Sequence, residues 1–505
     1  MKLTAYIPLF FLTAFSLSCC TSQKHPISYR KITLDSLSDV ADSQYVVRCA
    51  DIRKYIDNEI RHRHDSTFVD IRVNQLYKTA KARFFWISYK DGRIDERADT
   101  LLARIKDCAR HGLRESIFKT SLIERDLNKL KTLELDGEKL SAVMARTELN
   151  LTRAYMRYCC GMRYGFINPR KLFNRSEKNN DGTWKLIYDV NIELPNEEFI
   201  ALAEEKLREH DIAEFMSSLL PTNKLYVQYL KEYATASPEH RTKIAANMER
   251  MRWREKKEES DTYILVNIAA FMLRAYKDGD VLEMKICCGQ RDHKTPLLNS
   301  SIRHFELNPY WIVPRNIVKN EIVPEHAFDI DYFERNNMKI INRESGEEIA
   351  VENATPEILL SNKYCIRQEK GEGNSLGRII FRFPNNFSVY LHDTTNKGAF
   401  ERKWRGVSHG CVRVEKPFEL AKFLLGDNDE KLLDRIRVAM DLPPETEYGK
   451  RLQKKEGRHD INYHKFDKTI PVYLSYFTAY PGLDGRMEYY DDVYGYDALI
   501  TARLK

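Results

Sequence analysis

A cysteine and a histidine in the C-terminal half of the chain could act as a nucleophile and its base. Cys411 lies in the segment Ser-His-Gly-Cys-Val-Arg at residues 408–413, and His392 ends the strand-like run 388–391 upstream of it. A thiolate is a strong nucleophile, and an imidazole can remove the proton of a thiol. Attack on an amide carbonyl would give a thioester, which a second amine could resolve. The pair therefore predicts acyl transfer.

For an isolated pair of this kind, the commoner interpretation is a buried structural cysteine with an unrelated histidine nearby. The complete string is more specific, and it resembles the L,D-transpeptidase family, whose catalytic domain is called YkuD-like. The likeness is dense from about residue 247 to residue 496 and favours the longer branch of that family, which carries a scaffold domain. The segments that support it are 247–253, 263–268, 295–296, 307–314, 367–368, 373–377, 391–394, 470–473 and 478–479.

The resemblance implies a role for each residue of the motif. Cys411 would be the nucleophile and His392 the general base. The backbone N–H groups of Gly410 and Cys411 would stabilise the oxyanion, because a residue without a side chain permits close approach. His409 would shape the oxyanion site or contact substrate. Asp393 is only a possible neighbour of the imidazole, since the main chain does the orienting in that family.

Four further residues are candidates for binding the substrate. Arg413 could bind a carboxylate through two parallel hydrogen bonds, and an ion pair with Glu415 is an equally good interpretation. Ser408 could hold the turn before the nucleophile. The aromatic candidates for the groove are Tyr390 and Trp404.

The resemblance also implies the reaction and the partners. A donor tetrapeptide stem of peptidoglycan would lose its terminal D-alanine, and a neighbouring stem would resolve the thioester in a 3→3 crosslink. Water or a free D-amino acid as acceptor would make the same acyl-enzyme an L,D-carboxypeptidase or an exchange enzyme. A protein of another class, a non-catalytic scaffold that binds the cell wall, is the remaining alternative. Carbapenem-type lactams are expected to acylate Cys411, and no metal or other cofactor is implied.

The N-terminal segment has the pattern of a targeting signal. Lys2 supplies a positive charge, and the apolar run 6–17 is too short to span a membrane stably. It ends in two adjacent cysteines, which resembles a bacterial lipoprotein signal with lipid on Cys19 or Cys20. We therefore expect a signal at 1–20, a polar tether at 21–45, export to the periplasm and attachment to a membrane through the lipid.

Charge and cysteine content exclude other classes. The 505 residues include 81 basic and 74 acidic ones, so the net charge of +7 is a small excess that does not favour binding to nucleic acid. None of the ten cysteines has C-x-x-C spacing, which argues against a zinc or thioredoxin-type site. The adjacent pairs at 159–160 and 287–288 lie in apolar surroundings and are expected to be buried thiols.

The periodicity predicts an α+β chain of several domains. Helical spacing favours a mainly helical scaffold at 46–250, and alternation favours a mainly β catalytic domain at 254–505. A polar, irregular segment at about 315–370 matches the place of a lid in the family. Strands are expected at 262–268, 271–276, 281–287 and 475–479, and a helix at 417–425.

Overall fold

The computed structural model describes residues 47–62, 67–79, 84–88, 93–179, 181–209, 211–426, 429–455 and 461–504. The expected signal, the tether and both candidate lipidation sites, Cys19 and Cys20, lie outside these residues. No helix in the described ranges is long and apolar enough to cross a membrane.

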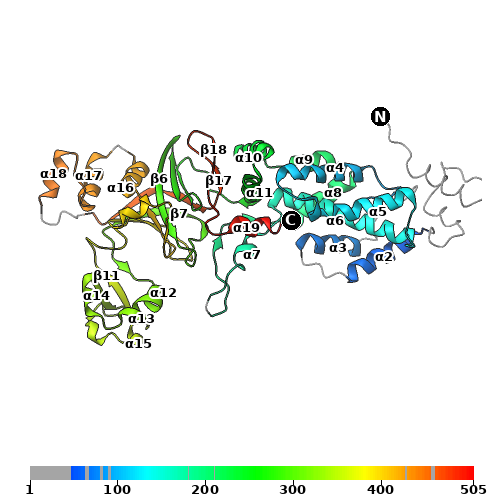
Figure 1. Ribbon diagram of the computed structural model, residues 1–505. Coiled ribbons are helices and arrows are strands. Elements are labelled where there is room, and N and C mark those ends of the chain that lie inside the picture. Colours follow the sequence, from blue (N-terminus) through cyan, green and yellow to red (C-terminus); the bar gives the residue numbers. More distant parts are fainter. Residues whose placement is uncertain are drawn as a thin grey trace, which may run out of the picture.

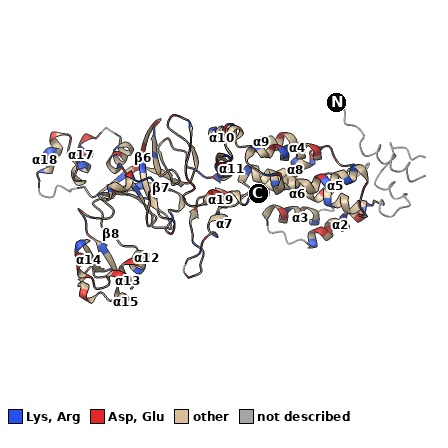
Figure 2. Cartoon of the chain, viewed as in Figure 1, with Lys and Arg blue, Asp and Glu red and all other residues tan. Residues whose placement is uncertain are grey.

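The chain forms an elongated molecule, with helices at one end and a β domain in the middle (Figure 1). Both signs of charge occur in each of these parts (Figure 2), as the small net charge predicts. The helices of the first part are α2 (Cys49–His62), α3 (Phe68–Thr79), α4 (Arg97–Asp107), α5 (Thr120–Thr132), α6 (Leu140–Tyr164), α7 (Pro169–Phe173), α8 (Glu197–Arg208), α9 (Ile212–Ser218), α10 (Lys224–Thr235) and α11 (Pro238–Arg252).

Helix α6 is the axis of this helical part, and most of its residues are buried because α2, α3 and α5 pack around it. A helix buried on all sides must pair its polar groups. Glu148 does so by accepting hydrogen bonds from the N–H groups of Phe85 and Trp86 and from the hydroxyl of Tyr77. Burial nevertheless raises the pKa of Glu148 to about 7.

The β domain is one large sheet that closes on itself. Its strand order is β1-β7-β12-β13-β15-β6-β5-β4-β16, and β16 pairs with both β4 and β7. The strands are β1 (Tyr188–Asp189), β4 (Tyr263–Asn267), β5 (Met272–Lys277), β6 (Asp280–Gly289), β7 (Leu297–Leu307), β12 (Ile379–Arg382), β13 (Leu391–His392), β14 (Gly406–Ser408), β15 (Val412–Val414) and β16 (Tyr463–Ser475). Closure leaves few free edges and encloses an apolar core.

The segment expected to be a lid, and called the lid below, forms an ordered subdomain, so the expectation of an irregular segment was wrong. Its sheet has the order β10-β9-β11-β8, with β8 (Trp311–Ile312), β9 (Met338–Asn342), β10 (Glu348–Ile349) and β11 (Tyr364–Gln368). The accompanying helices are α12 (Arg315–Ile317), the π-helical turn η5 (Val318–Ile322), α13 (Val323–His326), α14 (Ile330–Arg335) and α15 (Pro356–Leu359). They enclose a small core of their own around Phe333 and Ile340. Short strands with polar edges gave no clear period-2 signal.

The other elements match the sequence in part. The α+β class, the strands β4, β5 and β6, and helix α16 (Pro417–Leu425) are confirmed. The four adjacent thiols are buried and unbridged, as predicted. The late strand was misplaced, because β16 ends at Ser475 and β17 (Ala479–Pro481) begins only after a turn. Asn267 holds that turn by donating to the carbonyl of Phe477 and accepting from its N–H, both at 2.9 Å.

The remaining elements lie at the periphery and at the two junctions. Strand β2 (Ile192–Glu193) pairs with β3 (Arg254–Glu255), and β17 pairs with β18 (Met487–Tyr489). Helices α17 (Glu430–Ala439) and α18 (Glu447–Gln453) follow α16, and α19 (Tyr496–Thr501) packs on α11. The C-terminal segment therefore returns from the β domain to the helical part, where Figure 1 places α19 beside α11.

Candidate active site

Two adjacent parallel strands bring the cysteine and the histidine to one face of the sheet. In the β13–β15 pair, Leu391 lies opposite Val412 and His392 lies opposite Arg413. Leu391 and Val412 are fully buried in the core. Because side chains alternate along a strand, His392, Arg413 and their neighbours two residues earlier, Tyr390 and Cys411, face the other way.

That face forms the floor of a groove roofed by the lid. The groove has a volume of ≈ 780 Å³, and its lining includes all four of these residues together with Ser408 and His409. The lid contributes apolar and polar groups from η5, α14 and the strand β8. Cys411 and His392 therefore lie in a partly open groove of the size that small substrates need.

The thiol of Cys411 is largely protonated in this closed environment. Its side chain is partly exposed, and Sγ lies 3.8 Å from the carbonyl oxygen of Ser388. Burial raises the pKa of Cys411 to about 11, while hydrogen bonding from Tyr390 and the charge of Arg413 act in the opposite direction. The raised pKa favours the neutral thiol, so a nearby base is needed to take its proton during attack.

His392 is suited to that task because it is neutral. Its side chain is 4% exposed, and burial lowers its pKa to about 4, helped by the nearby charge of Arg413. The backbone and the charge of Asp393, and to a smaller extent the backbone of Leu376, act in the opposite direction and raise this pKa. Nδ1 is buried without any hydrogen-bond partner, so one ring nitrogen is free to accept a proton.

The turn before the nucleophile is held by hydrogen bonds on both sides. Ser408 Oγ donates to the carbonyl of Cys411 at 2.6 Å and accepts from the N–H of Gly410 at 3.1 Å. The N–H of Gly410 is therefore already hydrogen-bonded within the turn and is not available to an oxyanion. The N–H of Cys411 makes no hydrogen bond to the described residues, which leaves it as the available oxyanion donor.

Gly410 is needed at this position for its backbone conformation. Its φ is +118°, a value that residues with a side chain rarely adopt. The sequence predicts an oxyanion role for both backbone N–H groups, and only the one of Cys411 is free to play it here.

His409 and Arg413 contact different parts of the groove. His409 Nε2 lies 2.8 Å from Glu321 Oε1 of η5, so this histidine joins the catalytic turn to the lid. Arg413 does not pair with Glu415, whose carboxylate accepts from the N–H of Lys285 at 3.0 Å. The guanidinium makes no hydrogen bond or ion pair with the described residues, and its Nε is buried. A half-buried cation without a counter-ion is a site for an anionic group.

Trp404 is not part of this groove. Its indole N–H donates to the carbonyl of Gly406, and its ring packs against Phe271 and the guanidinium of Arg291. Asp393 also points elsewhere, because it accepts from the N–H groups of Arg378 and Thr394. The structure therefore brings six of the predicted site residues to the groove with His392 and Cys411 among them, and leaves Trp404 outside.

Tyr310, for which the sequence leaves a groove position open but favours packing in the core, is 41% exposed and lines the groove. The guanidinium of Arg367 lies 4.5 Å from its ring centre. Two other groove residues had no signal in the sequence. Glu321 and Arg382 lie far from the Ser-His-Gly-Cys motif along the chain, and neither belongs to a recognisable sequence motif. The described residues contain no group of three or more His, Cys, Asp or Glu side chains arranged to hold a metal ion.

Comparisons with known proteins agree with this geometry. Residues 261–438 match the family model of the L,D-transpeptidase catalytic domain, YkuD, and residues 72–232 match that of a Scaffold domain. A curated protein of Haemophilus influenzae described as "Putative L,D-transpeptidase" is 30% identical over 300 residues, which are 58% of this chain and 56% of that protein. The chain thus spans little more than half the length of this relative.

Two solved structures show a more distant likeness. They are "L,D-transpeptidase from Mycobacterium smegmatis", at 12% identity and a TM-score of 0.19, and "Structure of the Ldtfm-avibactam carbamoyl enzyme", at 14% and 0.17. Each covers 34% of this chain, and the matches cover 57% and 54% of the respective structures. Scores this low do not establish a shared fold.

The two family models account for the helical part and for the strands that carry the groove. The chain therefore carries an L,D-transpeptidase catalytic domain, YkuD, with a Scaffold domain N-terminal to it.

Proposed function

We propose that this protein is a cysteine-dependent L,D-transpeptidase that forms 3→3 crosslinks between the stem peptides of peptidoglycan. The observation that supports it most is the common face of β13 and β15. It presents a thiol, a neutral imidazole and an unpaired guanidinium to one roofed groove. The family resemblance supplies the substrate class.

In the first half-reaction, Cys411 attacks the carbonyl at the L-centre of the third residue of a donor tetrapeptide. His392 accepts the thiol proton as the C–S bond forms, and the N–H of Cys411 stabilises the oxyanion. When the tetrahedral intermediate collapses, the imidazolium returns the proton to the leaving amine, and D-alanine departs. The product is a thioester, which keeps the acyl group activated without a nucleotide.

In the second half-reaction, the side-chain amine of a neighbouring stem attacks the thioester. His392 removes a proton from this amine, and the thiol of Cys411 is released in its neutral form. The unpaired Arg413 is placed to bind a carboxylate of a stem peptide, since its guanidinium faces the groove beside both reacting groups. Water in place of the amine would make the enzyme an L,D-carboxypeptidase, and a D-amino acid would give exchange.

The place of action is the periplasm in this proposal. It rests on the apolar run at 6–17 and on the cysteines at its end, which would carry a lipid and anchor the protein to a membrane. Metabolic labelling with a fatty-acid probe, followed by mass spectrometry of the N-terminal peptide, tests the lipid. Substitution of Cys19 or Cys20 by alanine shows which cysteine carries it.

Mass spectrometry of reaction products tests the function. The purified chain from residue 21 onward is incubated with disaccharide-tetrapeptide, beside the Cys411→Ala variant. A crosslinked dimer that has lost one D-alanine, absent with the variant, is the expected result. A shortened monomer alone would assign carboxypeptidase activity. No product with a folded protein that still binds sacculi would favour the non-catalytic scaffold.

Labelling with a carbapenem tests the nucleophile separately. The strained lactam is expected to acylate Cys411, so the intact mass should rise by one adduct in the wild type only. Peptide mapping that places the adduct on another described cysteine would contradict the assignment.

A further inference from the structure

The peptide group between Gly410 and Cys411 is held from behind by Thr295. Thr295 Oγ1 donates a hydrogen bond to the carbonyl of Gly410 at 2.8 Å and accepts one from the N–H of Gly289 at 2.9 Å. Thr295 is completely buried and does not line the groove. Its hydroxyl therefore acts on the catalytic turn and not on a substrate.

A planar peptide bond makes this contact important for the oxyanion site. The carbonyl of Gly410 and the N–H of Cys411 belong to the same peptide plane and point in opposite directions. A hydrogen bond that fixes the carbonyl also fixes the direction of the N–H. Gly410 has no side chain to restrict this plane, so the restraint must come from outside the turn.

Tyr494 holds Thr295 and its neighbour in turn. Its hydroxyl donates to the carbonyl of Gly289 at 2.5 Å and accepts from the N–H of Thr295 at 3.2 Å. Burial raises the pKa of Tyr494, which keeps this hydroxyl a donor. The backbones at Gly289 and His293 are in close contact, because a Cβ atom on Gly289 would lie 1.9 Å from the carbonyl oxygen of His293.

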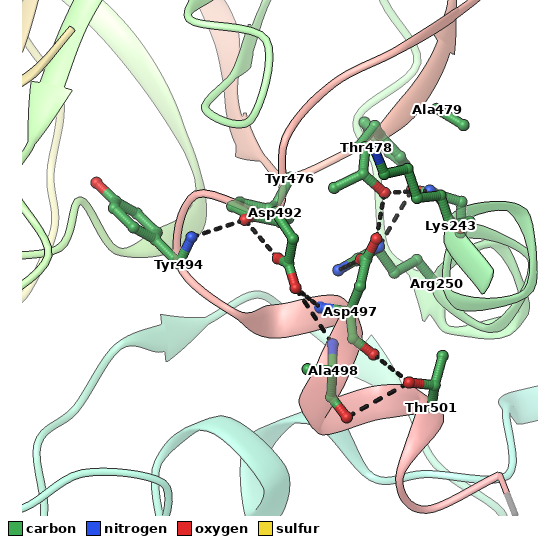
Figure 3. A network of polar contacts seen from close by, with 12 residues as sticks. Lys243, Arg250, Tyr476, Thr478, Ala479, Asp492, Tyr494, Asp497, Ala498 and Thr501 are labelled. Atoms are coloured by element: carbon green, nitrogen blue, oxygen red, sulfur yellow. Dashed lines mark hydrogen bonds and ion pairs between the residues drawn. The ribbon is translucent and has the colours of Figure 1, made fainter. Parts of the chain in front are cut away.

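The C-terminal segment anchors Tyr494 to the helical part (Figure 3). Its N–H donates to the hydroxyl of Tyr476 at 2.9 Å, which donates to Asp492 at 2.7 Å. Asp492 also accepts from the N–H groups of Asp497 and Ala498 in helix α19. Asp497 forms a buried ion pair with Arg250 of α11 at 2.7 Å. A continuous polar network thus runs from the helical part to the residue before the nucleophile.

We propose that Thr295 and Tyr494 are positioning residues, which aim the N–H of Cys411 at the oxyanion by fixing the peptide plane of Gly410. This rests on the proposed role of Cys411 as an acyl-accepting nucleophile. The network gives the C-terminal segment a part in this positioning although none of its side chains lines the groove.

The test compares two reactions of the same thiol. Acylation of Cys411 by p-nitrophenyl acetate builds an oxyanion, whereas alkylation by iodoacetamide does not. Both rates are measured on Cys411 by peptide mapping, and neither depends on peptidoglycan. The variants are Thr295→Val, which removes the hydroxyl, Thr295→Ser, which keeps it, and Tyr494→Phe.

We expect Thr295→Val to lower the ratio of acylation to alkylation by about ten- to a hundredfold. This is less than the loss of one oxyanion donor costs, because the N–H of Cys411 is misaligned and not removed. Thr295→Ser should restore the ratio, and Tyr494→Phe should lower it less. The matched control is Tyr229→Phe, which removes a buried hydroxyl that donates to the carbonyl of Ala479 at 2.6 Å, away from the turn. It should leave the ratio unchanged.

Equal slowing of both reactions, or an unchanged ratio in Thr295→Val and Tyr494→Phe, would overturn the proposal. If Thr295→Val does not fold, the ratio in Tyr494→Phe decides. Failure of the proposed function looks different, because stem peptides would then give no product with the wild type while the ratio still responds to the variants.

Discussion

The floor and the roof of the groove differ in how they are held in place. The floor is part of a closed sheet, where backbone register fixes the positions of His392 and Cys411 and buried hydrogen bonds hold the turn between them. The roof has a separate small core around Phe333, and it contacts the turn before Cys411 through the half-exposed ion pair of Glu321 with His409. A rigid floor suits chemistry that needs aligned atoms, and a separate roof suits the entry and choice of substrates.

The largest expected effect on the rate of acylation comes from a substitution in the floor of the groove. His392→Gln removes the base while keeping a polar side chain, and should lower the rate of Cys411 acylation by about 10²- to 10⁴-fold. The measurement is single-turnover acylation followed by intact mass. Thermal unfolding close to that of the wild type serves as the control. A loss of less than tenfold would mean that another group takes the proton.

The second prediction concerns the stability of the roof. Phe333 is 1% exposed in the core of the lid, so Phe333→Ala should destabilise this subdomain by about 3–5 kcal/mol. Hydrogen exchange should show fast exchange across β9 and β11 while β4, β5 and β7 stay protected. Matched loss of protection in the sheet would show that floor and roof unfold as one unit.

The third prediction concerns the pH dependence of the floor. The pKa of His392 is lowered to about 4, so its neutral, basic form persists down to that pH, and acylation should be lost only as pH falls through about 4. Arg413→Met removes a charge that lowers this pKa, so the acidic limb should move to higher pH. The rate of acylation measured against pH checks both. A limb that stays in place would contradict the electrostatic assignment.

The smallest effect is expected where floor and roof meet. Glu321→Gln removes a half-exposed ion pair of the kind worth about 0.2–1 kcal/mol. KM for a stem peptide should change severalfold or less, kcat should change little, and salt should reduce the difference between variant and wild type. Glu325→Gln, on the neighbouring helix of the lid, is the control. A large fall in kcat would place Glu321 in the chemistry.

How far the sequence could predict this protein is clearest on the floor. The apolar run that ends at Leu391 predicted a strand before His392, and the motif named His392 and Cys411. That the two side chains share one face follows only from the pairing of β13 with β15. The predicted run began at residue 388, whereas β13 begins only at Leu391. Residues 388–390 are not in a strand, because the side chain of Asn385 binds the backbone of Phe387 and Val389 in a turn.

The partners of charged and polar groups could not be predicted, because they come from distant segments. Adjacency suggested an ion pair between Arg413 and Glu415, but β6 brings Lys285 to Glu415 instead. The exception is local: the N–H of Gly410, a predicted oxyanion donor, donates instead to the hydroxyl of Ser408 two residues before it, because the turn folds back on itself.

The sequence by itself determined the types of group that can react, the period of the elements that carry them and the family. These are local properties, set by side-chain chemistry and by spacing along the chain. Only the tertiary structure decided that burial raises the pKa of the thiol and lowers that of the imidazole, that Arg413 is unpaired, and that a tyrosine near the C-terminus supports the turn before Cys411. Burial and long-range hydrogen bonds decide these features, and both depend on segments that are far apart in sequence.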